Sequence, residues 1–235
     1  MKEYSPVWPH GEIKNIFENI YIVRGTNITE YEGMKIQHSR NMTIINQNGD
    51  LTLINTVRLS DDGLNQLDNI GQVKHVVRIG AFHGRDDAFY LDRYNAEFWA
   101  FGSIEKPVGQ KINHSLSDSS SLPINDYQFF KFLGSSPEEG FIYCNCHGGI
   151  IFTCDSIKNW IEVDQFFSGE SGRAASEAGE IAKARISPIW LEATGMRKEA
   201  FNQILGLKFK HLISAHGDVL KNTAYESVKK SILEL

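Results

Sequence analysis

Short apolar runs separated by polar turns characterise the front of the chain and predict β-strands. Residues 42–46 and 51–55 form two such runs, and the Asn48–Gly49 pair between them favours a tight hairpin turn. Residues 20–23 form another short run, rich in the side chains that strands favour. Residues 75–79 include Val76, Val77 and Ile79, and we expect the next strand there, buried in the sheet.

Between these strands the apolar spacing changes and predicts two helices. Ser60 is suited to cap the first helix, apolar residues repeat at helical spacing from residue 64 to 70, and Gly71 is suited to end it. A second helix is expected from residue 86 or 87 to residue 94, followed by a strand over 97–101. This strand–helix–strand order is typical of helices that cross back over a sheet.

The second half of the chain contains two long polar segments. Residues 110–126 are polar and serine-rich, which indicates a surface loop. Residues 164–187 combine glycines with small and charged side chains, and we expect a mobile helical insertion or lid there. The other expected elements are a hairpin over 141–155, a helix over 198–205, a strand over 212–215 and a closing helix over 225–233.

Composition places the chain among ordinary globular domains. Its 235 residues are enough for one large domain, so we expect a single domain over residues 1–235. A net charge of -5 provides no basic surface for nucleic acid or for an anionic membrane, and no apolar run is long enough to span a bilayer. The first residues also lack the apolar segment of a signal peptide, so we expect a cytoplasmic protein. The oligomeric state is not encoded in these features.

The three cysteines, Cys144, Cys146 and Cys154, lie on the two strands of the expected 141–155 hairpin. An odd number of cysteines on adjacent strands makes a poor disulfide framework. A hairpin that turns at His147 and the following glycines would pair Cys144 with Phe152 and place the cysteines on one apolar face. Buried reduced cysteine behaves as a small hydrophobe, so we expect core residues here in preference to a thiolate metal site.

Ionisable side chains follow three of the predicted strands where each strand ends. They are His83, Arg85, Asp86 and Asp87 after the strand at 75–79, Asp155 after the run 150–153, and His216 with Asp218 after the strand at 212–215. Each one alone is more typical of a cap or a turn. Together they favour a site, because strand ends of adjacent strands meet at one edge of a sheet. Imidazole nitrogen and carboxylate oxygen are ligands that suit Zn, Fe or Mn.

The order of these groups resembles the metallo-β-lactamase fold superfamily over most of the chain, beginning with the strands at 20–24 and 41–55. The main motif of that superfamily is His-x-His-x-Asp-His after a strand. Its positions correspond here to His83, Arg85, Asp87 and Ala88. The resemblance implies a four-layer αββα sandwich.

The other ligand positions of the superfamily occur further along the chain. The turn that carries the third histidine corresponds to residues 134–137, where Ser135 takes the place of the ligand. The bridging aspartate corresponds to Asp155 and the last histidine to His216. His147 is a poor substitute for the missing histidine, because it lies at a hairpin turn about 20 Å of strand away from Asp155.

The resemblance preserves four candidate metal ligands, which are His83, Asp87, Asp155 and His216. It implies one Zn, Fe or Mn ion held by Asp87, Asp155 and His216 with an open position. Such an ion could activate water for hydrolysis of a small-molecule substrate. His83 would be a fourth ligand or a base, and Arg85 would orient the substrate, so the catalytic candidates are His83, Arg85 and Asp87.

Arg85 also supports the opposite interpretation. A fixed positive charge at a ligand position repels a dication and could pair with Asp87 or Asp155. The chain would then be a metal-free, non-catalytic binding or scaffold protein that retains the fold. A branch of the superfamily with a degenerate motif lacks the same histidines, and this likeness implies no particular activity. A redox role with two iron ions is disfavoured by the missing ligands.

Overall fold

The computed structural model describes residues 3–31 and 33–235, and its elements alternate between strands and helices along the chain. In chain order they are β1 (Lys14–Phe17), β2 (Ile20–Tyr31), β3 (Met34–Gln47), β4 (Asp50–Ile54), α1 (Asp61–Ile70), β5 (Gln72–Val77), α2 (Asp87–Tyr94), β6 (Glu97–Ala100), β7 (His114–Ser115), β8 (Tyr127–Lys131), β9 (Gly140–Cys144), β10 (Ile150–Thr153), β11 (Ile157–Lys158), α3 (Gly169–Glu177), β12 (Arg185–Ile186), α4 (Pro188–Thr194), the 3₁₀ helix η1 (Lys198–Phe201), α5 (Asn202–Leu205), β13 (His211–Ser214) and α6 (Ala224–Leu233).

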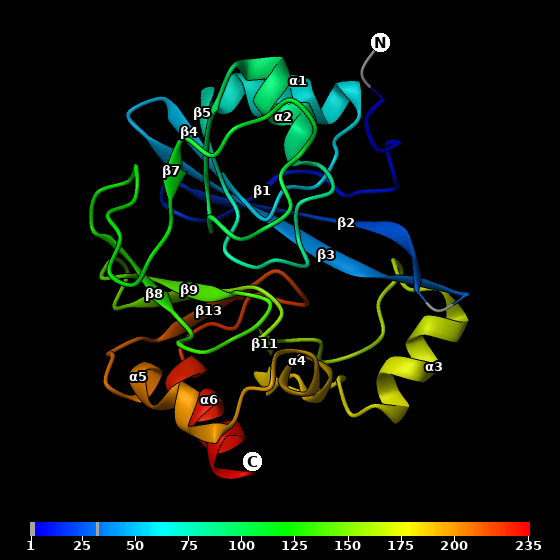
Figure 1. Ribbon diagram of the computed structural model, residues 1–235, viewed down its shortest axis with the longest axis vertical. Helices are drawn as coiled ribbons and strands as arrows, with labels where there is room; N and C mark the ends of the chain where they lie inside the picture. The colour runs from blue at the N-terminus through cyan, green and yellow to red at the C-terminus, as the bar shows by residue number, and fades with distance from the viewer. Residues whose placement is uncertain (1–2, 32) are drawn as a thin grey trace.

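Two sheets form the centre of the structure (Figure 1). The front half supplies a seven-stranded sheet of order β1-β2-β3-β4-β5-β6-β7, and the second half supplies a four-stranded sheet of order β13-β10-β9-β8. Helices α1 and α2 lie on the outer side of the first sheet, and α4, α5 and α6 lie on the outer side of the second (Figure 1). This is the four-layer αββα sandwich predicted from the sequence.

Alternation along the strands of the second sheet separates two apolar cores. Ile142 and Phe152 are fully buried in the large core, which also contains the strands of the first sheet. Their chain neighbours Phe141 and Ile151 point the other way, into a second core that contains Phe132 and residues of α4 to α6. The second sheet is therefore apolar on both faces, as its near-continuous hydrophobic runs require.

The β2–β3 hairpin is much longer than the apolar runs predict. The two strands pair continuously from Ile20↔Ile45 to Tyr31↔Met34, whereas the sequence predicts strands over 20–23 and 42–46. The additional pairs are mostly polar because this arm extends beyond the core toward α3 (Figure 1). The start of α3 binds this arm at Gln37, whose N donates to Ser171 Oγ at 2.9 Å and whose O accepts from Ser168 N at 3.1 Å.

The first predicted helix is confirmed with its cap. Ser60 Oγ accepts from the backbone N–H of Gly63 at 3.3 Å, and α1 ends before Gly71 as predicted. The helix predicted to begin at residue 86 or 87 is α2, which starts at Asp87. The region 164–187 contains helix α3. Helix α4, which follows it, was not predicted from the sequence.

The cysteine hairpin forms, but its predicted register is wrong by two residues. Cys144 pairs with Ile150, not with Phe152, because the turn occupies the five residues 145–149. Three of these have positive φ, namely His147 (52°), Gly148 (85°) and Gly149 (96°). The expectation of three reduced cysteines is also wrong, since Cys144 and Cys146 form a disulfide while Cys154 is free and buried. The predicted apolar face itself is confirmed.

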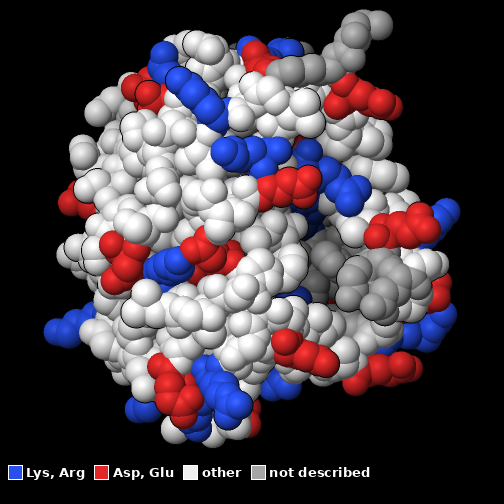
Figure 2. Space-filling view, in the orientation of Figure 1, with Lys and Arg blue, Asp and Glu red and all other residues white. Residues whose placement is uncertain are grey.

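The surface carries mixed charge. Figure 2 shows Lys and Arg side chains interspersed with Asp and Glu on the described part of this face, without an extended area of one sign. Among the described residues there is no helix with the length and hydropathy of a membrane span.

Replacing Phe132 with alanine tests the second core. Phe132 is fully buried against Phe141, Trp190 and Phe201, so its truncation should lower the free energy of unfolding by about 3–5 kcal/mol. The matched control is Phe82→Ala, at a side chain that is 56% exposed, which should change it by less than about 0.5 kcal/mol. Urea denaturation followed by circular dichroism measures both. Equal losses in the two variants would contradict this assignment of the core.

Candidate metal centre

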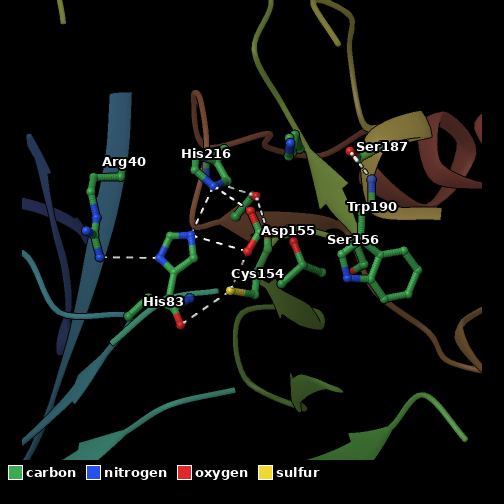
Figure 3. A network of polar contacts seen from close by, with 12 residues as sticks. Arg40, His83, Cys154, Asp155, Ser156, Ser187, Trp190 and His216 are labelled. Carbon is green, nitrogen blue, oxygen red and sulfur yellow. Dashed lines mark hydrogen bonds and ion pairs between the residues drawn. The ribbon is translucent and has the colours of Figure 1, made fainter. Parts of the chain in front are cut away.

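Three side chains from separate segments converge between the ends of the two sheets (Figure 3). His83 follows β5, Asp155 follows β10 and His216 follows β13. His83 Nε2 lies 3.0 Å from His216 Nε2, and His216 Nε2 lies 3.0 Å from Asp155 Oδ1. His83 Nε2 lies 3.4 Å from Asp155 Oδ2. His83 and His216 are 5% and 1% exposed, so the cluster is buried.

His216 is held by the turn that ends β13. Ala215 N donates to Thr153 O at 2.9 Å, which extends the parallel β10–β13 pairing up to the histidine. Gly217 follows at φ 87°, and a Cβ there would lie 2.1 Å from Asn159 O, so glycine is required at this turn. The Asn41 side chain of β3 donates to Gly217 O at 2.7 Å and connects this turn to the first sheet.

Asp155 is held by a buried carboxylate that the sequence interpretation missed. Glu139 Oε2 accepts from Asp155 N at 3.2 Å, and its Oε1 accepts from Ser156 N at 2.7 Å. Burial, together with the charge of Asp155, raises the pKa of Glu139 to about 8. Burial also acts to raise the pKa of Asp155, but the imidazoles of His83 and His216 outweigh it and lower that pKa well below its usual value. Asp155 is therefore the anionic member of the cluster.

A buried arginine lies beside His83 and was likewise not predicted. Arg40 of β3 places Nη2 3.4 Å from His83 Nδ1 and 2.8 Å from Thr56 O (Figure 3). Its Nη1 lies 3.8 Å from Asp86 Oδ2, and Arg40 is 4% exposed. Burial lowers the pKa of His83 to about 4, and the nearby positive charge of Arg40 acts in the same direction. His83 is therefore neutral at neutral pH.

Hydrogen-bond partners fix which nitrogen of each ring carries the proton. Arg40 can only donate, so His83 Nδ1 accepts and the proton of the neutral ring is on Nε2. The carbonyl of Ser39, 2.9 Å from His216 Nδ1, can only accept, so this nitrogen is protonated and His216 Nε2 holds a lone pair. That lone pair faces the Asp155 carboxylate at 3.0 Å. The protonated His83 Nε2, 3.0 Å from His216 Nε2, can donate to this lone pair, and a cation shared by His216 Nε2 and Asp155 Oδ1 would stabilise it as well.

The separations in the cluster suit a metal ion. Ligand bonds of about 2.0–2.1 Å in a tetrahedral site place the ligand atoms about 3.3–3.4 Å apart. The two imidazole Nε2 atoms lie 3.0 Å apart, His216 Nε2 lies 3.0 Å from Asp155 Oδ1, and His83 Nε2 lies 3.4 Å from Asp155 Oδ2. These separations are close to that spacing. Cys154 adds a further candidate, because ligand atoms of His83, Cys154 and Asp155 all lie within 4.8 Å of one another. Burial, with the charges of Asp155 and Glu139, raises the pKa of the Cys154 thiol and keeps it protonated in the absence of a cation.

The sequence matches no protein-family model and no curated protein. The structure, in contrast, superposes on solved metallo-β-lactamases along nearly the whole chain. The DIM-1 metallo-β-lactamase exposed to ceftazidime is 14% identical with a TM-score of 0.60, and the match covers 99% of each chain. FIM-1 from Pseudomonas aeruginosa, in a mono-zinc form, is 14% identical with a TM-score of 0.59, covering 97% of this chain and 96% of that one.

The chain has the metallo-β-lactamase fold. A mutant flavo di-iron protein from Thermotoga maritima also shares it, at 16% identity and a TM-score of 0.63. That match covers 96% of this chain and 62% of the di-iron protein, so the chain spans less than two thirds of that relative. The fold thus agrees with the resemblance inferred from the sequence.

Within the metallo-β-lactamase fold the structure brings together His83, Asp155 and His216 but leaves the other two predicted site residues outside. Asp87 is 1% exposed, and its Oδ2 accepts from Arg78 Nε at 2.7 Å. Its Oδ1 accepts from the Thr56 hydroxyl at 2.5 Å. The carboxylate is therefore bound to protein groups and does not face the cluster. Arg85 is exposed and donates to Ile28 O at 2.8 Å. The predicted pairing of Arg85 with Asp87 or Asp155 is therefore not formed.

Ser135 occupies a structural position and not a ligand position. Its hydroxyl donates to Phe132 O at 3.0 Å and accepts from Glu139 N at 3.2 Å. His147 lies at the β9–β10 turn, as expected, where its ring stacks on Phe17 with a centroid distance of 5.0 Å. Both side chains are thus committed to local contacts.

The sequence interpretation also missed the aromatic and imidazole groups around His216. The ring of His38 on β3 lies 5.1 Å from that of His216, and the Trp160 ring lies 4.7 Å from it. Burial, followed by the charge of His216, lowers the pKa of His38 well below its usual value. His38, Ser39 and Arg40 are consecutive on the polar arm of β3, and no sequence signal marked them because that arm lacks apolar alternation.

Replacing Asp87 with asparagine separates a structural role from a metal-binding role. Arg78 would lose its charged partner in a buried pair, so the free energy of unfolding should fall by about 3 kcal/mol or more. The same change at Asp68, which is 44% exposed and 3.8 Å from Arg93, should cost less than about 1 kcal/mol. Chemical denaturation measures stability, and mass spectrometry measures metal content. Loss of bound metal in a fully stable Asp87→Asn variant would show that Asp87 is a ligand.

Proposed function

We propose that the chain is a hydrolase of small-molecule substrates that uses one divalent ion bound by His83, Asp155 and His216. The observation that carries this proposal is the His216 Nε2 lone pair facing Asp155 Oδ1 at 3.0 Å, with His83 Nε2 at 3.0 Å from the same nitrogen. Two imidazoles and one carboxylate suit Zn, Fe or Mn. Similarity in fold to a mono-zinc metallo-β-lactamase and to a di-iron protein agrees with such an ion.

One ion fits these residues and two do not. A second ion would need ligands at the positions of Arg85, Asp87, Ala88 and Ser135. Arg85 is exposed, Asp87 is bound by Arg78, and the remaining two offer an apolar side chain and an internally bonded hydroxyl. The donor atoms that remain are sufficient for three protein ligands and an open position.

Each residue of the cluster has a definable task. A divalent ion there would supply the Lewis-acid polarisation that assists hydrolysis of esters, amides or phosphodiesters. Ser39 O fixes the His216 ring so that Nε2 faces the cluster, and Glu139 fixes the backbone of Asp155. Trp160 lies against His216 and excludes water from one side of it.

A metal-free binding protein is the second candidate, and Arg40 favours it. Its guanidinium lies 3.4 Å from His83 Nδ1 and keeps the proton of that ring on Nε2, the atom that would bind the ion. Without a metal ion, His83 Nε2 can donate to the lone pair of His216 Nε2 at 3.0 Å, and Asp155 Oδ2 lies 3.4 Å from the same donor. The two imidazoles thus interact without an ion, although Arg40 Nε is buried without a hydrogen-bond partner.

Metal analysis decides between the two candidates. Protein purified without chelator and desalted should contain about one equivalent of Zn, Fe or Mn that is lost in the Asp155→Ala variant, because the carboxylate supplies the anionic ligand. The matched control is Arg85→Met, at an exposed arginine of the same turn, which should retain the ion. The loaded protein, but not Asp155→Ala, should hydrolyse members of a panel of small esters, amides and phosphodiesters. Wild-type protein that binds no ion after dialysis against zinc would refute the proposal.

Removing the charge of Arg40 should strengthen metal binding. With Arg40→Met the His83 proton is free to move to Nδ1, and the repulsion between the guanidinium and a dication is removed. The zinc dissociation constant measured by competition with a chromophoric chelator should fall at least about tenfold, which corresponds to about 1.4 kcal/mol. Arg85→Met should leave it unchanged. Weaker binding in Arg40→Met, with the fold intact by circular dichroism, would mean that Arg40 supports the ion.

A further inference from the structure

The disulfide at the β9–β10 turn joins two sulfurs of unequal accessibility. Cys144 is the last residue of β9 and is fully buried. Cys146 is only partly buried, and it lies between the exposed residues Asn145 and His147. A thiol from solvent can therefore reach one sulfur of the pair and not the other. Redox-active cysteine pairs have this form, in which an accessible sulfur reacts and a second one beside it resolves the intermediate.

The turn does not need this disulfide for its shape. Gly149 N donates to Cys146 O at 2.8 Å, and Gly149 O accepts from the backbone N–H groups of Lys210 and His211 at 2.9 and 3.1 Å. Gly149, at φ 96°, also packs so closely that a Cβ there would lie 2.1 Å from Lys208 O. A cross-link between positions two residues apart closes a very short loop and removes little freedom from the unfolded chain. The disulfide is therefore better suited to exchange than to fastening the fold.

A backbone donor and a lysine favour the thiolates that exchange requires. Cys146 N donates to Cys144 Sγ at 3.1 Å, a hydrogen bond that stabilises negative charge on this sulfur. The Lys210 side chain crosses the turn, because a Cβ on Gly148 would lie 3.0 Å from its Cδ and 3.6 Å from its Nζ. Positive charge near a cysteine raises its thiolate fraction, and a stabilised thiolate is a better leaving group.

We propose that Cys144–Cys146 is a redox-active disulfide that dithiols reduce reversibly in the folded protein, with Lys210 as the charge that favours the thiolates. A thiolate of the dithiol attacks Cys146 Sγ and bonds to it, while the Cys144–Cys146 bond breaks and Cys144 leaves as a thiolate. The second thiol of the partner then attacks the partner's own sulfur in this mixed disulfide, and Cys146 leaves. Two electrons and two protons pass from the dithiol to the two cysteines, and the dithiol becomes a disulfide. The proposal uses no residue of the buried cluster and does not depend on its function.

Equilibration with glutathione tests the exchange. The full-length protein is incubated at increasing ratios of reduced to oxidised glutathione, quenched with acid, and alkylated in denaturant with N-ethylmaleimide. Mass spectrometry should show the number of alkylated cysteines rising from one to three in a single reversible transition, while circular dichroism shows a folded protein. The constant thiol is Cys154, so Cys154→Ala should keep the transition. A disulfide that resists millimolar dithiothreitol until the protein unfolds, or three thiols at every glutathione ratio, would overturn the proposal.

Single-cysteine variants test which sulfur is attacked. In Cys144→Ala the remaining Cys146 should form a mixed disulfide with oxidised glutathione, because this sulfur is accessible. In Cys146→Ala the remaining Cys144 is buried and should react at least about tenfold more slowly. Mass spectrometry of the intact proteins follows both reactions, and circular dichroism checks both folds. Equal rates in two folded variants would contradict the assignment of Cys146 as the attacked sulfur.

The charge of Lys210 is tested with thiols of different charge. Lys210→Met should slow reduction by the anionic thiol glutathione about two- to threefold more than reduction by neutral mercaptoethanol at low salt. Lys35→Met, at an exposed lysine of the β2–β3 arm, is the matched control and should change neither rate. Stopped-flow mixing followed by alkylation measures the rates. The same rate ratio in Lys210→Met as in the wild type would refute the role assigned to Lys210.

Discussion

The buried carboxyl group of Glu139 is the constraint on which the arrangement of the site depends. It binds the backbone N–H groups of Asp155 and Ser156, just after β10. Residues 138–140, which include Glu139, are also hydrogen-bonded to the turn after β5. Gly140 N donates to Ile79 O at 2.8 Å, and Ala81 N donates to Glu138 O at 3.0 Å. One segment thus connects the strand end that carries His83 with the strand end that carries Asp155. The Asn41 side chain of β3 donates to Gly217 O and so connects the turn that carries His216 to the first sheet. The site exists because the two sheets are joined at this edge.

Local patterns in the sequence were sufficient to predict several helices and strands, but not to predict how the strands pair. The Asn48–Gly49 hairpin and the helix between Ser60 and Gly71 are encoded by turn and cap chemistry within a few residues, and both form as predicted. The register of the cysteine hairpin depends on a turn with three successive positive φ angles, and residue types alone do not fix its length. The long polar arm of β2 and β3 carries no apolar alternation, so its pairing could not be inferred.

The candidate site was predictable to the same extent. His83, Asp155 and His216 were found because each follows a strand end, and a fold-level resemblance ordered them. Arg40 and Glu139 were not found because their role depends on contacts between distant segments. Asp87 was misplaced for the related reason that its true partner, Arg78, lies in the chain as an unremarkable residue after β5. A ligand motif specifies which residue types occur at which spacing. The oppositely charged partners of those residues come from distant segments, which only the packed structure brings together.

Buried arginines explain how the chain keeps the metallo-β-lactamase fold with fewer metal ligands. Asp87, at a ligand position of the motif, would be a costly buried charge without a cation, and Arg78 supplies one at 2.7 Å. Arg40 similarly supplies positive charge next to His83, between Thr56 O and Asp86. Arg78 thus supplies the positive charge that the buried Asp87 carboxylate requires in the folded chain.

Arg40 also influences the protonation of the candidate ion site. It cannot lose its charge, so it continuously favours the His83 tautomer with the proton on Nε2. Ser39 O, one residue away on the same strand, favours the opposite tautomer for His216, with Nε2 free. Two neighbouring residues of β3 thus prepare one imidazole for a metal ion and the other for a hydrogen bond. Because the two imidazoles share Asp155, a metal ion at this candidate site would have to overcome the His83 preference that Arg40 sets.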